Sequence, residues 1–204
     1  MMFSPGTQKE IDKLYKNRKH VELTIGTLKD GKMEVRHWGP DRQEKSGETL
    51  IYPVGSICKP FTASLLAKYI SQGKLDLSAP INRYIPGLPE RYYPSLEKLA
   101  THTSGYTTQP YTLWTTLPYF LKMNREGGLF HTNPYHGPCE KNANSGLAWR
   151  LEKDLPISWH GGATGAFSAF VGLNRETKTA AAVAANYGLV NAEPIGFSVL
   201  KNDL

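Results

Sequence analysis

Ser56 and Lys59 are the residues whose types and spacing indicate chemistry. They form a Ser-x-x-Lys pattern, and one helical turn places both side chains on the same face. A serine hydroxyl becomes a good nucleophile when a nearby base takes its proton, and a lysine can be that base where its surroundings favour the neutral amine. The free N–H groups of a helix N-terminus favour an anion forming beside them. The pattern therefore predicts acyl transfer through serine, although a helix cap followed by a surface lysine also fits these residues alone.

The helix that must carry this pair is predicted over residues 56–73. Proline is tolerated in the first turn of a helix, where its missing N–H has no intrahelical partner, so Pro60 requires a start near Ser56. Gly73 is suited to end the helix, and Gly55 adds a flexible residue before it. Apolar residues recur at every fourth position of this segment: Ile57, Phe61, Leu65 and Tyr69.

Strand patterns lie near both ends of the chain. The clearest is a hairpin between residues 21 and 37, where apolar residues alternate on both sides of the turn dipeptide Asp30-Gly31. Helices are predicted near residues 11–15 and over 194–200, and turns at 160–165 and 174–178 separate three further strands: 147–151, 167–173 and 179–186. We therefore expect an α+β fold in which one antiparallel sheet, built from both chain ends, is flanked by helices.

Length and composition exclude several classes of protein. The 204 residues, 40% of them hydrophobic and 21% charged, are typical of one globular domain rather than a disordered or fibrous chain. No apolar run approaches the roughly 20 residues that span a bilayer, and the first residues lack the pattern of a secretory signal. The net charge of +6 suggests an anionic partner, but only residues 16–20 are locally basic. We therefore expect no nucleic-acid partner and no transmembrane segment, and localisation stays open.

Four segments together resemble the serine β-lactamase and penicillin-binding protein superfamily, specifically the class C β-lactamase-like branch. That branch also holds D-aminopeptidases, DD-carboxypeptidases and esterases. The resemblance covers most of residues 20–137 and 144–188 in the family's order. The segments that carry it are Tyr52-Pro53-Val54-Gly55-Ser56-Ile57-Cys58-Lys59, Gly73-Lys74-Leu75-Asp76-Leu77, Leu99-Ala100-Thr101-His102-Thr103-Ser104-Gly105 and Trp159-His160-Gly161-Gly162-Ala163-Thr164-Gly165.

The resemblance implies roles for individual residues. Ser56 would be the acylated nucleophile and Lys59 its proton acceptor, with the backbone N–H groups of Ser56 and Ala163 as the oxyanion hole. The run His160-Gly161-Gly162 stands where many members have Lys-Thr-Gly and would face the polar or carboxylate end of the substrate; a strand histidine on the solvent face is the alternative for His160. His102 would shape a loop. The resemblance implies no metal and no organic cofactor.

The family's second motif, Tyr-x-Asn, does not occur between the histidine segment and the third motif. Tyr135 is a positional candidate for its tyrosine, and a plain loop is the alternative. Only 104 positions separate Ser56 from His160, and residues 138–143 look like a seam. We therefore expect one β-lactamase-like domain over 1–204, with a sheet region at 1–55 and 144–204. Residues 56–143 would hold the nucleophile helix and the remnant of a helical lobe, which is either truncated or missing from the sequence.

Two functions stay open at this point. The first is a serine hydrolase that forms an acyl-enzyme on a peptide, amide or ester; its substrate would be a small molecule or peptide, including a β-lactam or a peptidoglycan fragment. The replacement of lysine by His160 favours a peptide or ester over efficient β-lactam hydrolysis. The second is a catalytically impaired binding or regulatory relative that keeps the pocket and lacks the second-motif tyrosine.

Overall fold

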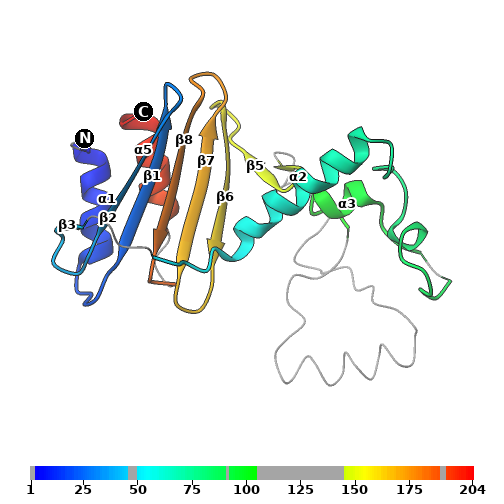
Figure 1. The fold of residues 1–204 in the computed structure, drawn as a ribbon, viewed down its shortest axis with the longest axis horizontal. Helices are drawn as coiled ribbons and strands as arrows, with labels where there is room; N and C mark the ends of the chain where they lie inside the picture. The colour runs from blue at the N-terminus through cyan, green and yellow to red at the C-terminus, as the bar shows by residue number, and fades with distance from the viewer. Residues whose placement is uncertain (1–2, 46–49, 91, 105–144, 189–191) are drawn as a thin grey trace. The chain divides into compact units, whose positions relative to one another are not determined.

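The computed structural model describes residues 3–45, 50–90, 92–104, 145–188 and 192–204 (Figure 1). The chain divides into two compact units, residues 1–62 with 149–204 and residues 63–148. The first unit therefore joins the two chain ends, as the strand patterns near both ends predict, and it contains both Ser56 and Lys59.

Seven strands of the first unit form one antiparallel sheet in the order β3-β2-β1-β8-β7-β6-β5. Because β1 pairs with β8, the N-terminal hairpin and the C-terminal strands share one sheet, so the expected α+β architecture is confirmed (Figure 1). The strands are β1 (Leu23–Lys29), β2 (Lys32–Trp38), β3 (Glu44–Lys45), β5 (Trp149–Leu151), β6 (Ile157–Ala163), β7 (Ser168–Asn174) and β8 (Thr179–Ala185).

Two terminal helices, α1 (Pro5–Tyr15) and α5 (Glu193–Asn202), pack on one face of this sheet. Alternate strand residues point into the core beneath them, and each fully buried Leu, Ile or Phe contributes about 1.5–3 kcal/mol. The Asp203 carboxylate accepts the Ser4 N–H at 2.6 Å, which ties the end of α5 to the start of α1. The most buried large side chains of this core include Leu14, Leu23, Ile25, Phe170, Ile195 and Val199.

Two turns of the sheet show where glycine signals were informative and where they misled. Asp30 and Gly31 have φ of 51° and 72°, the left-handed values that a two-residue hairpin turn requires, so the predicted hairpin is confirmed. The turn predicted at 160–165 is wrong for its first four residues, because β6 continues through Ala163 and pairs with β7 along its whole length. The reversal falls at Thr164–Phe167, where the Thr164 N–H donates to the Phe167 carbonyl at 2.9 Å.

Helix α2 (Cys58–Ser71) follows the short 3₁₀ helix η1 (Gly55–Ile57) and runs from the first unit into the second. It ends as predicted: Gly73 has a φ of 66°, and its N–H and that of Lys74 donate to carbonyls of the last turn. The four-residue repeat indicated the helix correctly, but Phe61 and Leu65 are 72% and 52% exposed. Of the residues in that repeat, Ile57 is buried, whereas Phe61, Leu65 and Tyr69 form an exposed stripe of α2.

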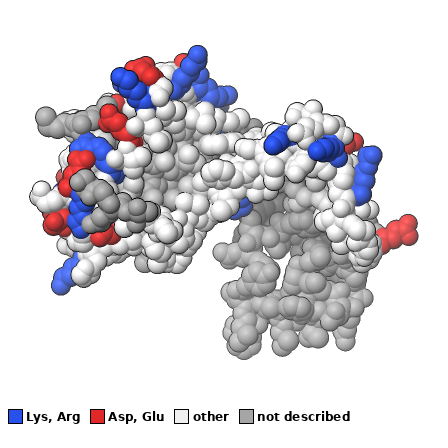
Figure 2. Space-filling view, in the orientation of Figure 1, with Lys and Arg blue, Asp and Glu red and all other residues white. Residues whose placement is uncertain are grey.

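The second unit also contains η2 (Ile81–Arg83), α3 (Leu96–Ala100) and β4 (Ser145–Gly146). Within the described ranges, every helix is too short or too polar to span a bilayer. On the face of the first unit seen in Figure 2, Lys and Arg side chains are interspersed with Asp and Glu. The positive net charge is therefore not gathered into a single patch on that face.

Tyr15 joins α1 to the end of β2 and offers a test of this packing. The ring is 6% exposed, and its hydroxyl donates to the carbonyl oxygens of Trp38 and Gly39 at 3.2 and 3.0 Å. Burial, helped by the negative charge of Glu22, raises the pKa of Tyr15 to about 12. Because the raised pKa favours the neutral folded form, its stabilisation is complete below pH 10 and is lost as the pH rises toward 12.

We expect Tyr15→Phe to lower the free energy of unfolding by about 1–2 kcal/mol at pH 8, because two buried carbonyls lose their donor. The difference between wild type and variant should shrink as the pH rises from 10 to 12. Urea unfolding of both proteins across this range measures it. A difference that stays constant from pH 8 to 12 would contradict the assignment.

Candidate active site

The turn that carries Ser56, the predicted nucleophile, is built from residues 54–58 and is termed the nucleophile turn. The Ile57 N–H donates to the Val54 carbonyl at 3.3 Å, and the Cys58 N–H donates to the carbonyls of Gly55 and Ser56. These bonds wind the chain into η1 and lead directly into α2, whose third residue is Pro60. The predicted helix start near Ser56 is therefore confirmed, with Ser56 in the 3₁₀ turn that precedes the α-helix.

Ser56 and Lys59 are brought into direct contact by this turn. The Lys59 Nζ donates to the Ser56 Oγ at 2.6 Å, Ser56 is half-buried, and Lys59 is exposed. If the lysine were neutral, it would accept the hydroxyl proton along this hydrogen bond. The structure thus brings the Ser56 and Lys59 side chains into contact, as the Ser-x-x-Lys spacing predicts.

The end of β6 packs against the nucleophile turn through backbone atoms. A Cβ on Gly162 would lie 1.9 Å from the Val54 carbonyl oxygen, and a Cβ on Gly55 would lie 2.6 Å from the Ala163 carbonyl oxygen. Gly55 also has a φ of 55°, which side chains rarely allow. Both positions need glycine, and together they place the Ala163 backbone beside the residue that precedes Ser56.

His160 lies on the same face of β6 as Gly162, because alternate strand residues share a face. It is 6% exposed, and its Nδ1 lies 2.6 Å from the Gly161 carbonyl oxygen. The alternative of a solvent-facing strand histidine is therefore wrong. Gly161 points to the opposite face, where a Cβ would lie 2.0 Å from a carboxylate oxygen of Glu193 at the start of α5.

The remaining residues singled out from the sequence lie apart from this group or outside the described residues. Tyr135 and the seam at 138–143 lie outside the described residues. His102 follows α3 in the second unit with a φ of 59°. Cys58 carries an exposed free thiol. The candidate site is therefore made from β6 and the nucleophile turn of the first unit.

A buried polar chain beside this site was missed by sequence reasoning. The Thr24 and Tyr52 hydroxyls lie 3.0 Å apart, the His37 Nδ1 lies 3.2 Å from the Thr24 Oγ1, and the His37 Nε2 lies 2.9 Å from a Glu22 carboxylate oxygen. Burial raises the pKa of the Tyr52 hydroxyl, which keeps it protonated. The hairpin register pairs Thr24 with His37. Aligning the two strands about the Asp30-Gly31 turn could therefore have predicted the contact between Thr24 and His37 from the sequence.

The fold and the sequence of this chain can now be compared with those of known proteins. The family model described as Beta-lactamase matches residues 7–125, so the chain belongs to that family. A β-lactamase from Providencia stuartii is 32% identical over 108 residues, and one from Pseudomonas fluorescens is 29% identical over 100 residues. These matches cover 48% and 47% of this chain but 28% of each relative's length.

Solved structures resemble this one over most of its length. An octameric penicillin-binding protein homologue from Pyrococcus abyssi has a TM-score of 0.67 at 15% identity, covering 95% of this chain and 76% of the other. A D-alanine carboxypeptidase from Burkholderia cenocepacia has a TM-score of 0.65 at 16% identity, covering 96% and 97%. A class C β-lactamase from Rhodobacter sphaeroides has a TM-score of 0.64 at 14% identity, covering 97% and 98%. At these low sequence identities, the likeness shows that this chain and the three solved structures share a fold.

The contact between β6 and the nucleophile turn predicts the effect of adding one methyl group. We expect Gly162→Ala to lower the free energy of unfolding by about 3 kcal/mol, the upper end for overpacking, because its Cβ would collide with a carbonyl oxygen. Gly165→Ala is the matched control, since its Cβ would meet nothing within 4 Å. Chemical denaturation measures both, and equal stability of the two variants would contradict the close approach.

Proposed function

We propose that this chain is a serine hydrolase that forms an acyl-enzyme on a peptide, amide or ester. The observation that carries the proposal is the 2.6 Å contact between the Lys59 Nζ and the Ser56 Oγ at a helix N-terminus. The backbone of Ala163 packs against Gly55, the residue before Ser56, which supports a role for the Ala163 N–H in an oxyanion hole. Membership of the Beta-lactamase family supports the same class of reaction.

In the first step, Lys59 in its neutral form accepts the Ser56 proton while the Oγ attacks the substrate carbonyl carbon. The carbonyl oxygen becomes an anion that the N–H groups of Ser56 and Ala163 stabilise; one such donor typically contributes about 10²–10³ in rate. Collapse of this intermediate breaks the C–N or C–O bond, and the proton passes from Lys59 to the leaving group. Water then hydrolyses the serine ester, which restores the Ser56 hydroxyl.

The substrate preference is inferred from β6. His160 lies on the strand face that meets the nucleophile turn, which supports a contact between its imidazole and the polar or carboxylate end of a substrate. An imidazole is a weaker and pH-dependent cation than the lysine that many members carry. We infer a small peptide or ester as the preferred substrate over a β-lactam. Relatives with this fold include a D-alanine carboxypeptidase and a D-amino acid amidase.

The reaction is tested with a fluorescent penicillin and a p-nitrophenyl ester. We expect wild type to form a covalent adduct or to turn over at least one of them, and Ser56→Ala to do neither. Lys59→Met should lower the acylation rate by about 10²–10⁴-fold, because the proton acceptor is removed from an exposed position at little cost in stability. Mass spectrometry of the adduct and stopped-flow absorbance measure these effects.

Unfolding midpoints of both variants serve as the control for folding. The proposal is rejected if neither reagent reacts and Ser56→Ala is indistinguishable from wild type. Saturable binding of a peptidoglycan fragment without acylation of Ser56 would instead identify a binding relative.

A second prediction tests the role of His160. We expect His160→Lys to raise the rate with the penicillin relative to the ester, because a permanent positive charge would face the carboxylate of the penicillin. The ratio of the two kcat/KM values measures this preference. A ratio that is unchanged would show that His160 does not contact the substrate's polar end.

A further inference from the structure

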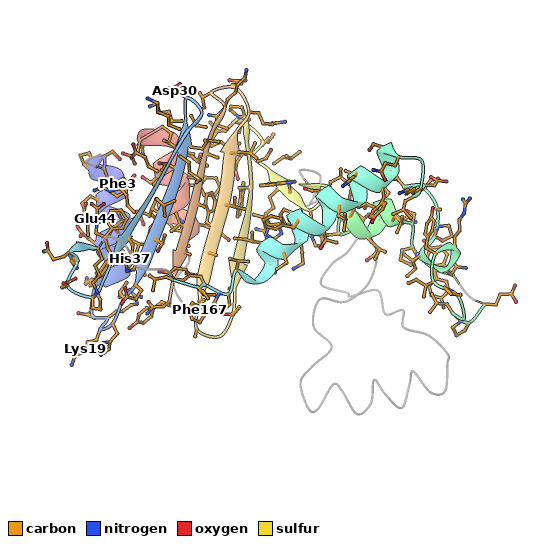
Figure 3. All side chains as sticks on the ribbon, in the orientation of Figure 1. Phe3, Lys19, Asp30, His37, Glu44 and Phe167 are labelled. Atoms are coloured by element: carbon orange, nitrogen blue, oxygen red, sulfur yellow. The ribbon has the colours of Figure 1, made fainter. Side chains whose placement is uncertain are left out.

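The geometry assigns Tyr52 a positioning role: through its hydroxyl bond to Thr24 and its ring contact with Phe167, it fixes the nucleophile turn that carries Ser56. This inference rests on the proposed function, because it concerns the rate at which Ser56 is acylated. Figure 3 shows the two ends of the arrangement, with His37 on β2 and Phe167 at the turn between β6 and β7.

Tyr52 is held at both its ring and its hydroxyl. The ring packs edge-on against Phe167, with centroids 6.3 Å apart and an interplanar angle of 86°. The hydroxyl lies 3.0 Å from the Thr24 Oγ1 on β1. One side chain therefore connects the hairpin at the N-terminal side of the sheet with the turn that follows Ala163.

Thr24 is itself held by a buried histidine. His37 is 7% exposed, and its Nδ1 lies 3.1 Å from the Leu23 carbonyl oxygen and 3.2 Å from the Thr24 Oγ1. Because a carbonyl can only accept, this nitrogen carries the proton, and Nε2 faces the Glu22 carboxylate at 2.9 Å. The imidazole is thus held through Nδ1, and the Thr24 hydroxyl has a defined place for the Tyr52 bond.

Tyr52 is two residues from the nucleophile turn, and this connects it to the proposed reaction. Val54, two residues later, accepts the Ile57 N–H that closes the nucleophile turn, and its carbonyl oxygen is the atom that Gly162 must accommodate. A shift of Tyr52 would therefore move the turn along β6 and change the position of the Ser56 N–H relative to the Ala163 N–H. Displacements of about 1 Å in such a geometry can cost about 10²-fold in rate.

The test compares acylation of wild type, Tyr52→Phe and Thr24→Val by the p-nitrophenyl ester. Each variant removes one hydroxyl and keeps the shape of its side chain. We expect kcat to fall about tenfold with KM unchanged, since the turn and not the substrate pocket is disturbed. Both changes remove the hydrogen bond between Tyr52 and Thr24, and Thr24→Val also removes the contact with His37, so the double variant should lose no more than Thr24→Val alone. Tyr187→Phe is the matched control: it removes a tyrosine hydroxyl that bonds to the Lys19 carbonyl.

A wild-type kcat in Tyr52→Phe, or multiplicative losses in the double variant, would overturn the inference. Amide hydrogen exchange of residues 54–57 gives a second readout that needs no activity. Faster exchange there in Tyr52→Phe than in Tyr187→Phe supports the positioning role even if Ser56 of wild type is never acylated, a result that would reject the proposed function alone. Equal exchange in the two variants overturns the positioning role.

Discussion

The contact between the nucleophile turn and β6 is the constraint on which the candidate site depends. Two stretches of backbone meet where the Val54 carbonyl faces Gly162 and Gly55 faces Ala163, at distances that leave no room for a Cβ on either glycine. Neighbouring main chains, unlike side chains, cannot change rotamer to relieve a collision, so this contact allows little freedom. It brings the backbones of two segments that are more than 100 residues apart in sequence into direct contact.

The rest of the first unit holds β6 in position for this contact. Strand β6 is held by its full pairing with β7, and β7 is held by β8, which pairs with β1. The buried face of these strands is covered by α1 and α5, whose ends are tied by Ser4 and Asp203. The opposite face carries His160, Thr24 and His37, so polar groups lie on the side of the sheet where the nucleophile turn passes.

Local signals in the sequence predicted much of this arrangement. The Asp30-Gly31 turn, the alternating strands and Pro60 near the helix start act over a few residues, and the structure has the corresponding elements. The glycines after His160 misled because glycine has two uses, in turns and at close approaches of backbone, and only the packed structure shows that Gly162 serves the second. The four-residue repeat in α2 indicated a helix but not which face is buried, because burial depends on what packs against it.

By itself, the sequence determined the family of this protein through the match over residues 7–125, and it predicted the chemistry from a serine one helical turn before a lysine. Tertiary structure alone decided which other polar groups lie near that pair. The burial of His160 and the series of polar contacts from Glu22 to Tyr52 each require distances between atoms on different elements. Such distances are set by packing and strand register over the whole unit, and no local pattern of residues contains them.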